Sequence, residues 1–274
     1  MEKNYLEMIR ETADFVRKQV GEVPQIAVIL GTGLGDLVNH IEVKCELDYH
    51  NIPNFPVSTV EGHSGKLIFG NLGGRYIMAM QGRFHYYEGY DMKQVTFPVR
   101  VMRELGVETL FVSNAAGGMN KEFQVGDVMV ITDHINLFPE NPLRGKNYAE
   151  LGPRFPAMTE AYSHALVNMA DDIAREDNIR LMHGVYVGTP GPTFETPAEY
   201  EYFRIIGGDA VGMSTVPEVI VANHAGMKVF GVSVITDLGG KDITEVPTHE
   251  EVQKAAVKAQ PVMTHVIKQM LARL

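Results

Sequence analysis

An arginine and a histidine two positions apart are the residues of this sequence best suited to bind an anion. Arg83 and His85 lie in the segment 81–90, which follows a strand-like run and contains three tyrosines. A planar guanidinium offers a fork of donors that matches phosphate, and side chains two residues apart on an extended chain point to the same side. The pattern predicts an oxyanion clamp at the carboxyl end of a strand. The alternative is a solvated arginine beside a satisfied polar histidine.

A glycine-rich turn supplies a second group of donors. The segment 31–36, Gly-Thr-Gly-Leu-Gly-Asp, follows the apolar run 26–30 and leads into a helix that we expect to begin near Leu37. Glycines let the backbone approach an anion closely, and the Thr32 hydroxyl and helix N–H groups add donors. The segment predicts either a phosphate cradle or a tight structural turn. It departs from the dinucleotide-binding fingerprint, which requires glycine where the chain has Asp36.

Other loops carry groups that suit a heteroaromatic base and further anion contacts. Phe194 offers a stacking surface, and Glu195 beside it can accept a ring N–H. The small residues 113–118 allow a ligand close to backbone N–H groups, or simply tight packing of a helix on a strand. Ser214 lies between a short strand and a helix, where it serves a ligand or caps the helix. His63 lies in another glycine-flanked loop.

Several classes of protein are excluded. The chain has 34 acidic and 24 basic residues, a formal net charge of −10, which argues against a general nucleic-acid or anionic-membrane binder. The single cysteine, Cys45, allows no intrachain disulfide and fits a reducing compartment. The sequence lacks a signal-peptide pattern and any run of about eighteen apolar residues, so we expect a cytoplasmic protein. Because hydrolase and metal-site motifs are missing, we expect chemistry without a metal ion or a covalent nucleophile.

The elements that must position these residues alternate between strand and helix. Apolar runs predict strands at 26–30, 76–80, 110–113, 128–132, 184–187 and 229–235. Amphipathic or helix-favouring stretches predict helices at 6–20, 92–105, 159–177, 196–206, 216–225 and 249–273. This alternation predicts an α/β protein with a parallel or mixed sheet covered on both faces. No linker or repeat divides the chain, so we expect one domain over residues 1–274.

Three connecting segments have unusual composition. The loops 137–158 and 188–197 are rich in proline, which is typical of functional or interface loops, although rigid connectors are the alternative. The polar segment 237–249 contains two adjacent glycines, and we expect it to form a mobile flap.

Taken together, these motifs resemble the trimeric class of purine nucleoside phosphorylases over nearly the whole chain. The matching segments are 31–35, 61–63, 81–90, 113–118, 155–158, 191–199, 211–223 and 248–251. The resemblance implies a single domain with a mixed central sheet flanked by helices, the nucleoside phosphorylase fold. It also implies a homotrimer with no metal or organic cofactor and with inorganic phosphate as co-substrate.

The resemblance also implies a role for each site residue. Phosphate binding falls to Thr32, His63, Arg83, His85, Ser214 and the backbone N–H of Ala115. The residues implied to bind the purine base are Phe194, Glu195, Asp237 and Ala115. The residues implied to bind the ribose are Tyr87, Met213 and His249. Phe155 is implied to reach into the site of the neighbouring subunit. His85, Glu195 and Asp237 are the residues implied in catalysis.

Two positions depart from the pattern of this family. Thr32 replaces a serine and keeps the hydroxyl, whereas Asp237 replaces an asparagine. An ionised aspartate only accepts hydrogen bonds, which favours a 6-amino group on the purine, while Glu195 needs the N1–H of a 6-oxopurine. A protonated Asp237 would donate instead, and this requires a raised pKa. We expect inosine and guanosine to be substrates, with an enzyme that prefers adenosine or methylthioadenosine as the alternative.

Three competing interpretations stay open at the level of the sequence. The related methylthioadenosine phosphorylases also use an aspartate in the base pocket, although the run 194–197 fits the purine nucleoside enzymes better. A dinucleotide-binding dehydrogenase would explain the glycine turn but not the pair Arg83 and His85. A non-catalytic nucleoside-binding protein of the same fold is the third possibility.

Overall fold

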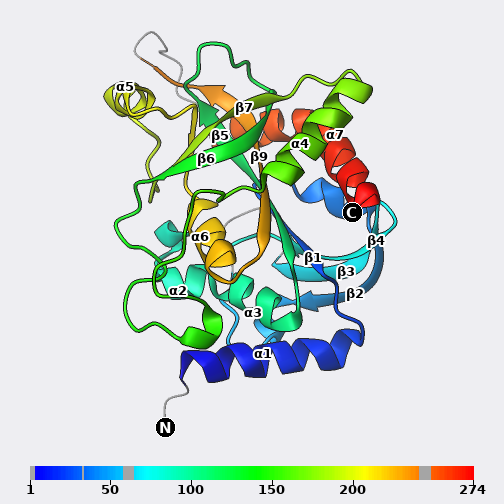
Figure 1. Cartoon of the computed structure of the whole chain (residues 1–274). Coiled ribbons are helices and arrows are strands. Elements are labelled where there is room, and N and C mark those ends of the chain that lie inside the picture. Colours follow the sequence, from blue (N-terminus) through cyan, green and yellow to red (C-terminus); the bar gives the residue numbers. More distant parts are fainter. Residues whose placement is uncertain (1–3, 33, 58–64, 241–247) are drawn as a thin grey trace.

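The computed structural model describes residues 4–32, 34–57, 65–240 and 248–274 (Figure 1). The strands are β1 (Ile26–Leu30), β2 (Glu42–Asp48), β3 (Lys66–Leu72), β4 (Arg75–Gln81), β5 (Thr109–Gly118), β6 (Val128–Asn136), β7 (Met182–Gly188), β8 (Ala210–Gly212) and β9 (Lys228–Leu238). The α-helices are α1 (Tyr5–Val20), α2 (Met92–Val95), α3 (Phe97–Leu105), α4 (His164–Glu176), α5 (Pro197–Ile205), α6 (Val216–His224) and α7 (His249–Arg273). Short 3-10 turns occupy Gly35–His40, Tyr49–Asn51, Tyr86–Glu88 and Ala149–Leu151.

Within the described residues, the strands form one mixed sheet in the order β2-β3-β4-β1-β5-β8-β7-β6-β9. Since β9 also pairs with β5, the last five strands of this order close on themselves. β1 is parallel to β4 and to β5, and β5 is parallel to β9, so the carboxyl ends of these four strands meet at one edge. The remaining pairs include antiparallel ones, such as β5 with β8 and β6 with β9. The predicted mixed α/β fold is confirmed.

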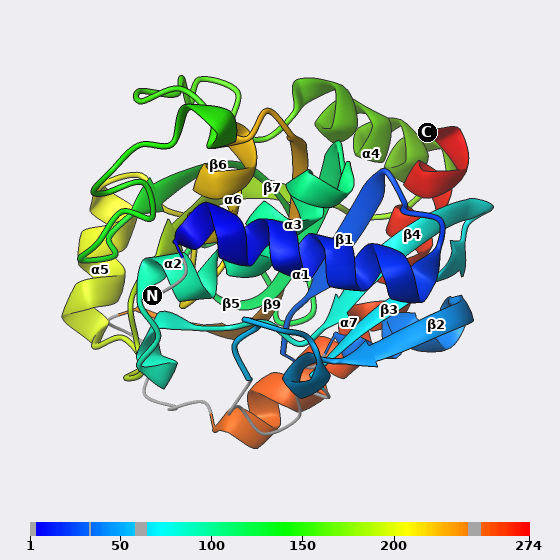
Figure 2. The ribbon, with the colours of Figure 1, turned by 90° about the horizontal axis from the view of Figure 1, so that it is seen from below.

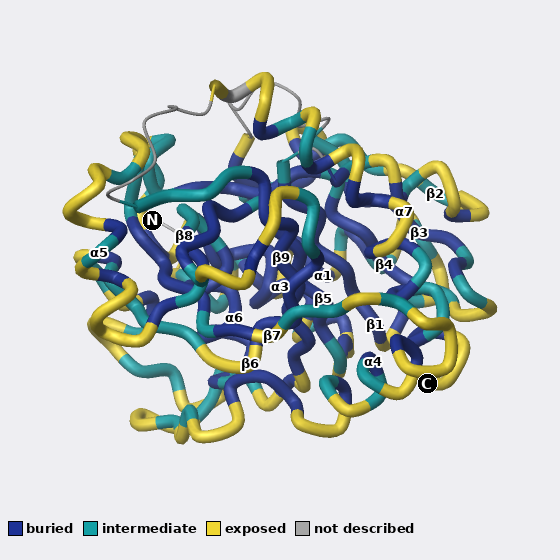
Figure 3. The backbone as a smooth tube through the Cα atoms, turned by 90° about the horizontal axis from the view of Figure 1, so that it is seen from above, coloured by how far each residue is buried: buried dark blue, intermediate teal, exposed yellow. Residues whose placement is uncertain are grey.

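The helices form two layers, one on each side of the sheet (Figures 1 and 2). α1, α2, α3 and α6 pack on one face, and α4 and α7 pack together on the other. The central strands of the sheet, such as β1 and β9, run through the buried centre of the molecule, as the backbone coloured by burial shows (Figure 3). Each layer of helices packs on the sheet through its own cluster of buried apolar side chains. The ends of the strands are thus held between two layers of helices.

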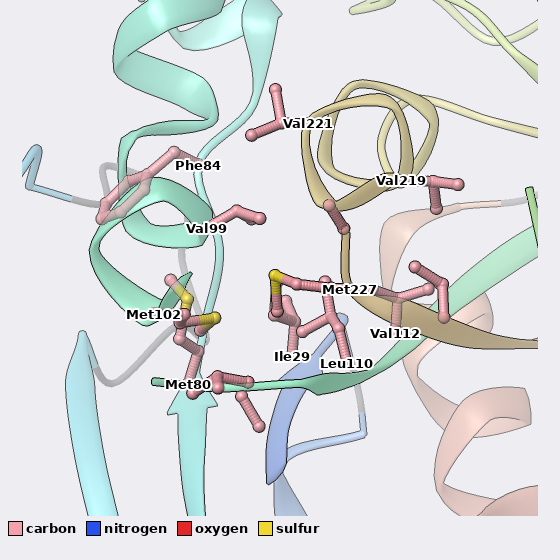
Figure 4. Close-up of a cluster of buried hydrophobic side chains, with 14 of the residues drawn as sticks. Ile29, Met80, Phe84, Val99, Met102, Leu110, Val112, Val219, Val221 and Met227 are labelled. Carbon is pink, nitrogen blue, oxygen red and sulfur yellow. The ribbon is translucent and has the colours of Figure 1, made fainter. Parts of the chain in front are cut away.

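The apolar cluster beneath α3 and α6 anchors the elements that carry the site. Figure 4 shows Val99 and Met102 from α3 and Val219 from α6 beside side chains of the central strands, such as Leu110 of β5. Each of these four side chains is buried. Burying a side chain of this size contributes about 1.5–3 kcal/mol of stability, so the cluster fixes α6 firmly against the sheet. The N-terminus of α6 is thereby fixed as well.

Most of the predicted elements are present, with three corrections. The predicted helix 92–105 is divided at Thr96 into α2 and α3, because Pro98 lies in the first turn of α3 and cannot donate a backbone hydrogen bond. The predicted helix 159–177 begins at His164 instead, after Ser163 at the N-cap. The expected helix near Leu37 is the 3-10 turn Gly35–His40.

Two strands were not anticipated, and one expectation lies mostly outside the described residues. β2 and β3 pair antiparallel with each other and extend the sheet beyond β4. The expected flap at 237–249 includes residues 241–247, which lie outside the described part of the chain. Among the described residues, no helix is both long and apolar enough to cross a membrane.

Candidate active site

A cavity of about 330 Å³ opens at the edge where the carboxyl ends of β1, β4, β5 and β9 meet. Its size is typical of a small-molecule site. The end of β8 and the loop between β7 and α5 complete the wall. Among the residues implied by sequence, those that line this cavity are Thr32, Arg83, His85, Tyr87, Ala115, Phe194, Glu195, Met213, Ser214 and Asp237.

Arg83 follows β4 and is held by a buried ion pair. Its Nε and Nη2 donate to the two carboxylate oxygens of Glu218 at 3.0 and 2.9 Å, and its Nη1 donates to the carbonyl of Ser113 at 2.5 Å. Both charged side chains are almost fully buried, with 1% and 4% exposed. A Cβ on Gly31 would lie 2.8 Å from Asn114 Cα and 3.3 Å from Nη1, so this glycine permits the close approach. The guanidinium is therefore fixed in the cavity wall.

Glu218 is not among the site residues predicted from the sequence, although its position in the sequence indicates a buried ion pair. Glu218 lies in the first turn of α6, a helix whose other residues are largely apolar and buried. A lone carboxylate in such a helix needs a buried partner. Its partner, Arg83, is 135 positions away in the sequence.

His85 is oriented by a second carboxylate. Its Nδ1 lies 3.0 Å from Oε1 of Glu88, which also accepts the backbone N–H of His85 at 2.8 Å. The ring stacks on Tyr87 with a centroid distance of 4.7 Å. Burial lowers the pKa of His85, so the neutral ring dominates at neutral pH, even though Glu88 favours the charged form. A neutral ring that donates from Nδ1 to Glu88 has Nε2 as an acceptor, suited to the O–H of a partly protonated phosphate.

The N-terminus of α6 completes the part of the cavity near Arg83. Thr215 is the N-cap residue, with a φ of 69°, and no side chain of the described residues makes the capping hydrogen bond. Ser214 therefore does not cap α6, and its hydroxyl lies 3.1 Å from that of Thr215. Asn114 donates from Nδ2 to the Thr215 hydroxyl at 2.9 Å, while its buried Oδ1 has no hydrogen-bond partner among the described residues. The positive end of the helix and these polar groups favour an anion.

A pair of carboxylates lines another part of the cavity. Glu195 accepts from the Thr189 hydroxyl at 3.4 Å, and burial together with the charge of Asp237 raises its pKa. Asp237 accepts from the Thr236 hydroxyl at 2.9 Å and from the Tyr200 hydroxyl at 3.3 Å. Burial raises the pKa of Asp237, and both hydrogen bonds oppose this rise. Phe194, which is 44% exposed, lies next to Glu195 in the cavity wall.

Three residues implied by the sequence are not placed in this cavity. Phe155 is 87% exposed and lies beside Arg154, outside the cavity of its own chain. His63 lies outside the described residues, and so does the side chain of His249, the first residue of α7. In the described part of the chain, no group of three or more His, Cys, Asp or Glu side chains is arranged to hold a metal ion. The expected absence of a metal or organic cofactor stays a prediction.

Comparison with known proteins agrees with this geometry. The family model described as the phosphorylase superfamily matches residues 25–272. Purine nucleoside phosphorylase 1 of Bacillus subtilis is 51% identical over 97% of this chain and 98% of its own. The bovine purine nucleoside phosphorylase, from Bos taurus, is 49% identical over 97% and 94%. The Schistosoma mansoni purine nucleoside phosphorylase, crystallised with adenosine, superposes with a TM-score of 0.92 at 42% identity, over 97% of this chain and 96% of that one.

The chain therefore belongs to the phosphorylase superfamily. Within that superfamily, its similarity over nearly the full length places it among the purine nucleoside phosphorylases, which are enzymes of the glycosyltransferase type. This membership excludes the dinucleotide-binding dehydrogenase.

Proposed function

We propose that the enzyme catalyses the reversible phosphorolysis of purine ribonucleosides and deoxyribonucleosides in purine salvage. Inosine and guanosine are its substrates, and the products are the free base and ribose 1-phosphate or deoxyribose 1-phosphate. The observation that carries this proposal is that the Arg83 and His85 pair lines the same cavity as Glu195 and Asp237. A phosphate and a purine base thus have suitable partners within one cavity.

The geometry supports a mechanism that acts on both ends of the bond to be broken. Cleavage of the N-glycosidic bond leaves positive charge at the anomeric carbon and negative charge on the purine. A phosphate beside Arg83 and the N-terminus of α6 stabilises the ribosyl cation and then attacks it. Glu195 holds the departing 6-oxopurine through its N1–H, and Asp237 bonds to the base when a proton lies between them. No side chain has to act as a nucleophile, and neither a metal nor an organic cofactor takes part.

Thr32, His63, Ser214 and the backbone N–H of Ala115 complete the proposed phosphate site. Tyr87, Met213 and His249 form the proposed ribose site. Tyr87 and Met213 are supported by their position in the cavity wall, where Tyr87 also stacks on His85. The proposal for His63 and His249 rests on the sequence resemblance alone.

A second candidate is a preference for adenosine or methylthioadenosine. The observation that favours it is Asp237, which accepts hydrogen bonds from two hydroxyl groups and therefore presents acceptor oxygens to the cavity. The Schistosoma mansoni relative has been crystallised both with adenosine and with inosine.

The experiment that tests the proposed function measures base release from inosine, guanosine, adenosine and methylthioadenosine, each with and without phosphate. We expect cleavage of inosine and guanosine that depends on phosphate and produces a sugar 1-phosphate. Cleavage confined to adenosine or methylthioadenosine would select the second candidate. Base release at the same rate with and without phosphate would contradict the mechanism.

We further propose that the enzyme works as a homotrimer in the cytoplasm. The free thiol of Cys45 is compatible with a reducing compartment. The proposed trimer rests on the sequence resemblance, and the side chain of Phe155, which is 87% exposed, is accessible for a contact with a neighbouring subunit. In this assembly, Phe155 reaches the ribose end of the neighbour's cavity.

Replacing Phe155 with alanine is expected to raise the KM for inosine about tenfold, because the neighbouring site loses an apolar wall. Sedimentation of the unmodified protein is expected to give three times the mass of one chain. Val125→Ala is the matched control, since Val125 is also exposed, at 55%, but lies in another loop. A monomeric mass at assay concentration, or equal KM values for both variants, would contradict the proposed role of Phe155.

A further inference from the structure

Tyr200 occupies a buried position between the two carboxylates of the base pocket. It lies on α5, is 7% exposed and lines the cavity together with Glu195 and Asp237. Its hydroxyl donates to Oδ2 of Asp237 at 3.3 Å. The neighbouring residue Tyr202, by contrast, is 52% exposed. Tyr200 is therefore the tyrosine of α5 that lines the cavity.

Two glycines make the room that Tyr200 needs. A Cβ on Gly117 of β5 would lie 2.6 Å from the Tyr200 oxygen and 3.0 Å from Oδ2 of Asp237. A Cβ on Gly239 would lie 2.1 Å from Cζ of the Tyr200 ring. Gly117 is also paired with Asp237 in the register of β5 and β9. The ring is thus enclosed on both sides, and the position of its hydroxyl relative to Asp237 is set by the sheet.

The electrostatic surroundings keep Tyr200 a donor. Burial and the negative charges of Asp237 and Glu195 raise the pKa of Tyr200 far above that of an ordinary phenol. The tyrosine consequently retains its proton throughout the range in which enzymes are assayed. The Tyr200 hydroxyl interacts with both Glu195 and Asp237. Because it donates to Asp237, it lowers the pKa of that carboxyl and stabilises its ionised form.

We propose that Tyr200 raises the activity of this enzyme on adenosine relative to inosine, because its hydroxyl holds Asp237 as a pure hydrogen-bond acceptor that suits the 6-amino group of a purine. Each oxygen of Asp237 accepts one hydroxyl, from Thr236 or Tyr200, and each retains a lone pair for the substrate. An amino group donates to these lone pairs, whereas the O6 of inosine gains no donor from Asp237, so inosine is held through its N1–H and Glu195 instead. This inference rests on the proposed function, since it concerns the base of a nucleoside substrate.

The first test is the variant Tyr200→Phe, which removes the hydroxyl and keeps the ring between the two glycines. We expect the ratio of kcat/KM for adenosine to that for inosine to fall about tenfold, because a hydrogen bond to a charged group is lost. Tyr202→Phe on the same helix is the matched control and leaves the ratio unchanged. An unchanged or increased ratio in Tyr200→Phe would overturn the inference, and so would an equal loss for both substrates, which indicates a packing role.

The second test uses the pH dependence of the same ratio. In a Glu195→Gln background, in which position 195 does not titrate, Asp237 gains a proton as the pH falls and becomes a donor toward O6, so the ratio of adenosine to inosine activity falls. The Tyr200 hydrogen bond lowers the pKa of Asp237, so its removal shifts this fall to higher pH. Among the described residues, the charged groups that face this pair are Glu195 and, acting on Glu195, Glu199. From the neighbouring elements, β5 presents Gly117 and α7 presents Val252 to the cavity. A fall at the same pH in both proteins would refute the role of Tyr200.

The third test asks whether Tyr200 acts through Asp237. In an Asp237→Asn background, Tyr200→Phe should no longer change the ratio, because the side chain at position 237 cannot ionise. A tenfold change that persists in this background would assign the effect to direct contact of Tyr200 with the base and would overturn the inference. Absence of phosphate-dependent cleavage in the unmodified enzyme would instead contradict the proposed function, so the two failures are distinguishable.

Discussion

Replacing Glu195 with alanine is expected to lower kcat/KM for inosine by about 10²- to 10⁴-fold, the scale of losing an electrostatic contact to the transition state. Glu195 lies in the cavity wall, and its carboxylate is the acceptor that matches the N1–H of a 6-oxopurine. Without it, the N1–H of the departing base has no acceptor, and the base is held less firmly while the bond breaks.

The same carboxylate predicts how activity depends on pH. Burial and the charge of Asp237 raise the pKa of Glu195, so it takes up a proton at a higher pH than an exposed glutamate does. Activity on inosine should therefore fall toward acid pH, starting above the usual range of a glutamate. In Glu195→Gln, which does not titrate, this part of the pH profile should be absent.

Steady-state kinetics of purified Glu195→Ala with inosine and saturating phosphate provide the measurement. Glu201→Ala is a suitable control, because Glu201 lies on the neighbouring helix α5 and forms a surface ion pair with Arg204 at 2.9 Å. Such pairs contribute little to stability, so the control should turn over normally. Turnover close to that of the unmodified enzyme in Glu195→Ala would remove Glu195 from the mechanism.

The central strands of the fold were predictable because their sequences are nearly continuous apolar runs. β1, for example, is buried at every position from Ile26 to Leu30. β2 was missed because it carries an exposed or half-exposed side chain at each position, so its sequence has no apolar signature. A signal for the hairpin of β3 and β4 was present in Gly73 and Gly74, which have positive φ and separate the two strands.

The site residues that could be predicted are those whose role follows from their residue type and from their position next to a strand in the sequence. Arg83 and His85 follow a strand, and their chemistry is visible from sequence alone. The roles of Glu218 and Tyr200 depend on contacts across the fold. Glu218 reaches Arg83 from 135 positions away, and Tyr200 reaches Asp237 only because two glycines leave room for its ring. No local sequence pattern indicates contacts between residues so far apart in the chain, so only the structure shows these two pairs.

Replacing Arg83 with alanine is expected to impair both phosphate binding and folding. The kcat/KM for inosine and phosphate should fall by about 10²- to 10⁴-fold, because the charge that orients the phosphate is lost. The same change leaves the carboxylate of Glu218 buried without its partner. Breaking a buried pair from one side typically costs about 3–5 kcal/mol of stability, so thermal unfolding should occur at a clearly lower temperature.

The double variant Arg83→Ala with Glu218→Ala separates these two effects. It removes both members of the ion pair and leaves no buried charge, so its unfolding temperature should lie above that of Arg83→Ala. Its catalytic defect should persist, because the missing guanidinium is the group that meets the phosphate. Arg83→Lys completes the series: a lysine keeps the positive charge but lacks the planar fork that binds both oxygens of Glu218, so the KM for phosphate should still rise. If the double variant folds and keeps the KM for phosphate of the unmodified enzyme, Arg83 serves only to neutralise Glu218, and the anion must be held by the N-terminus of α6 instead.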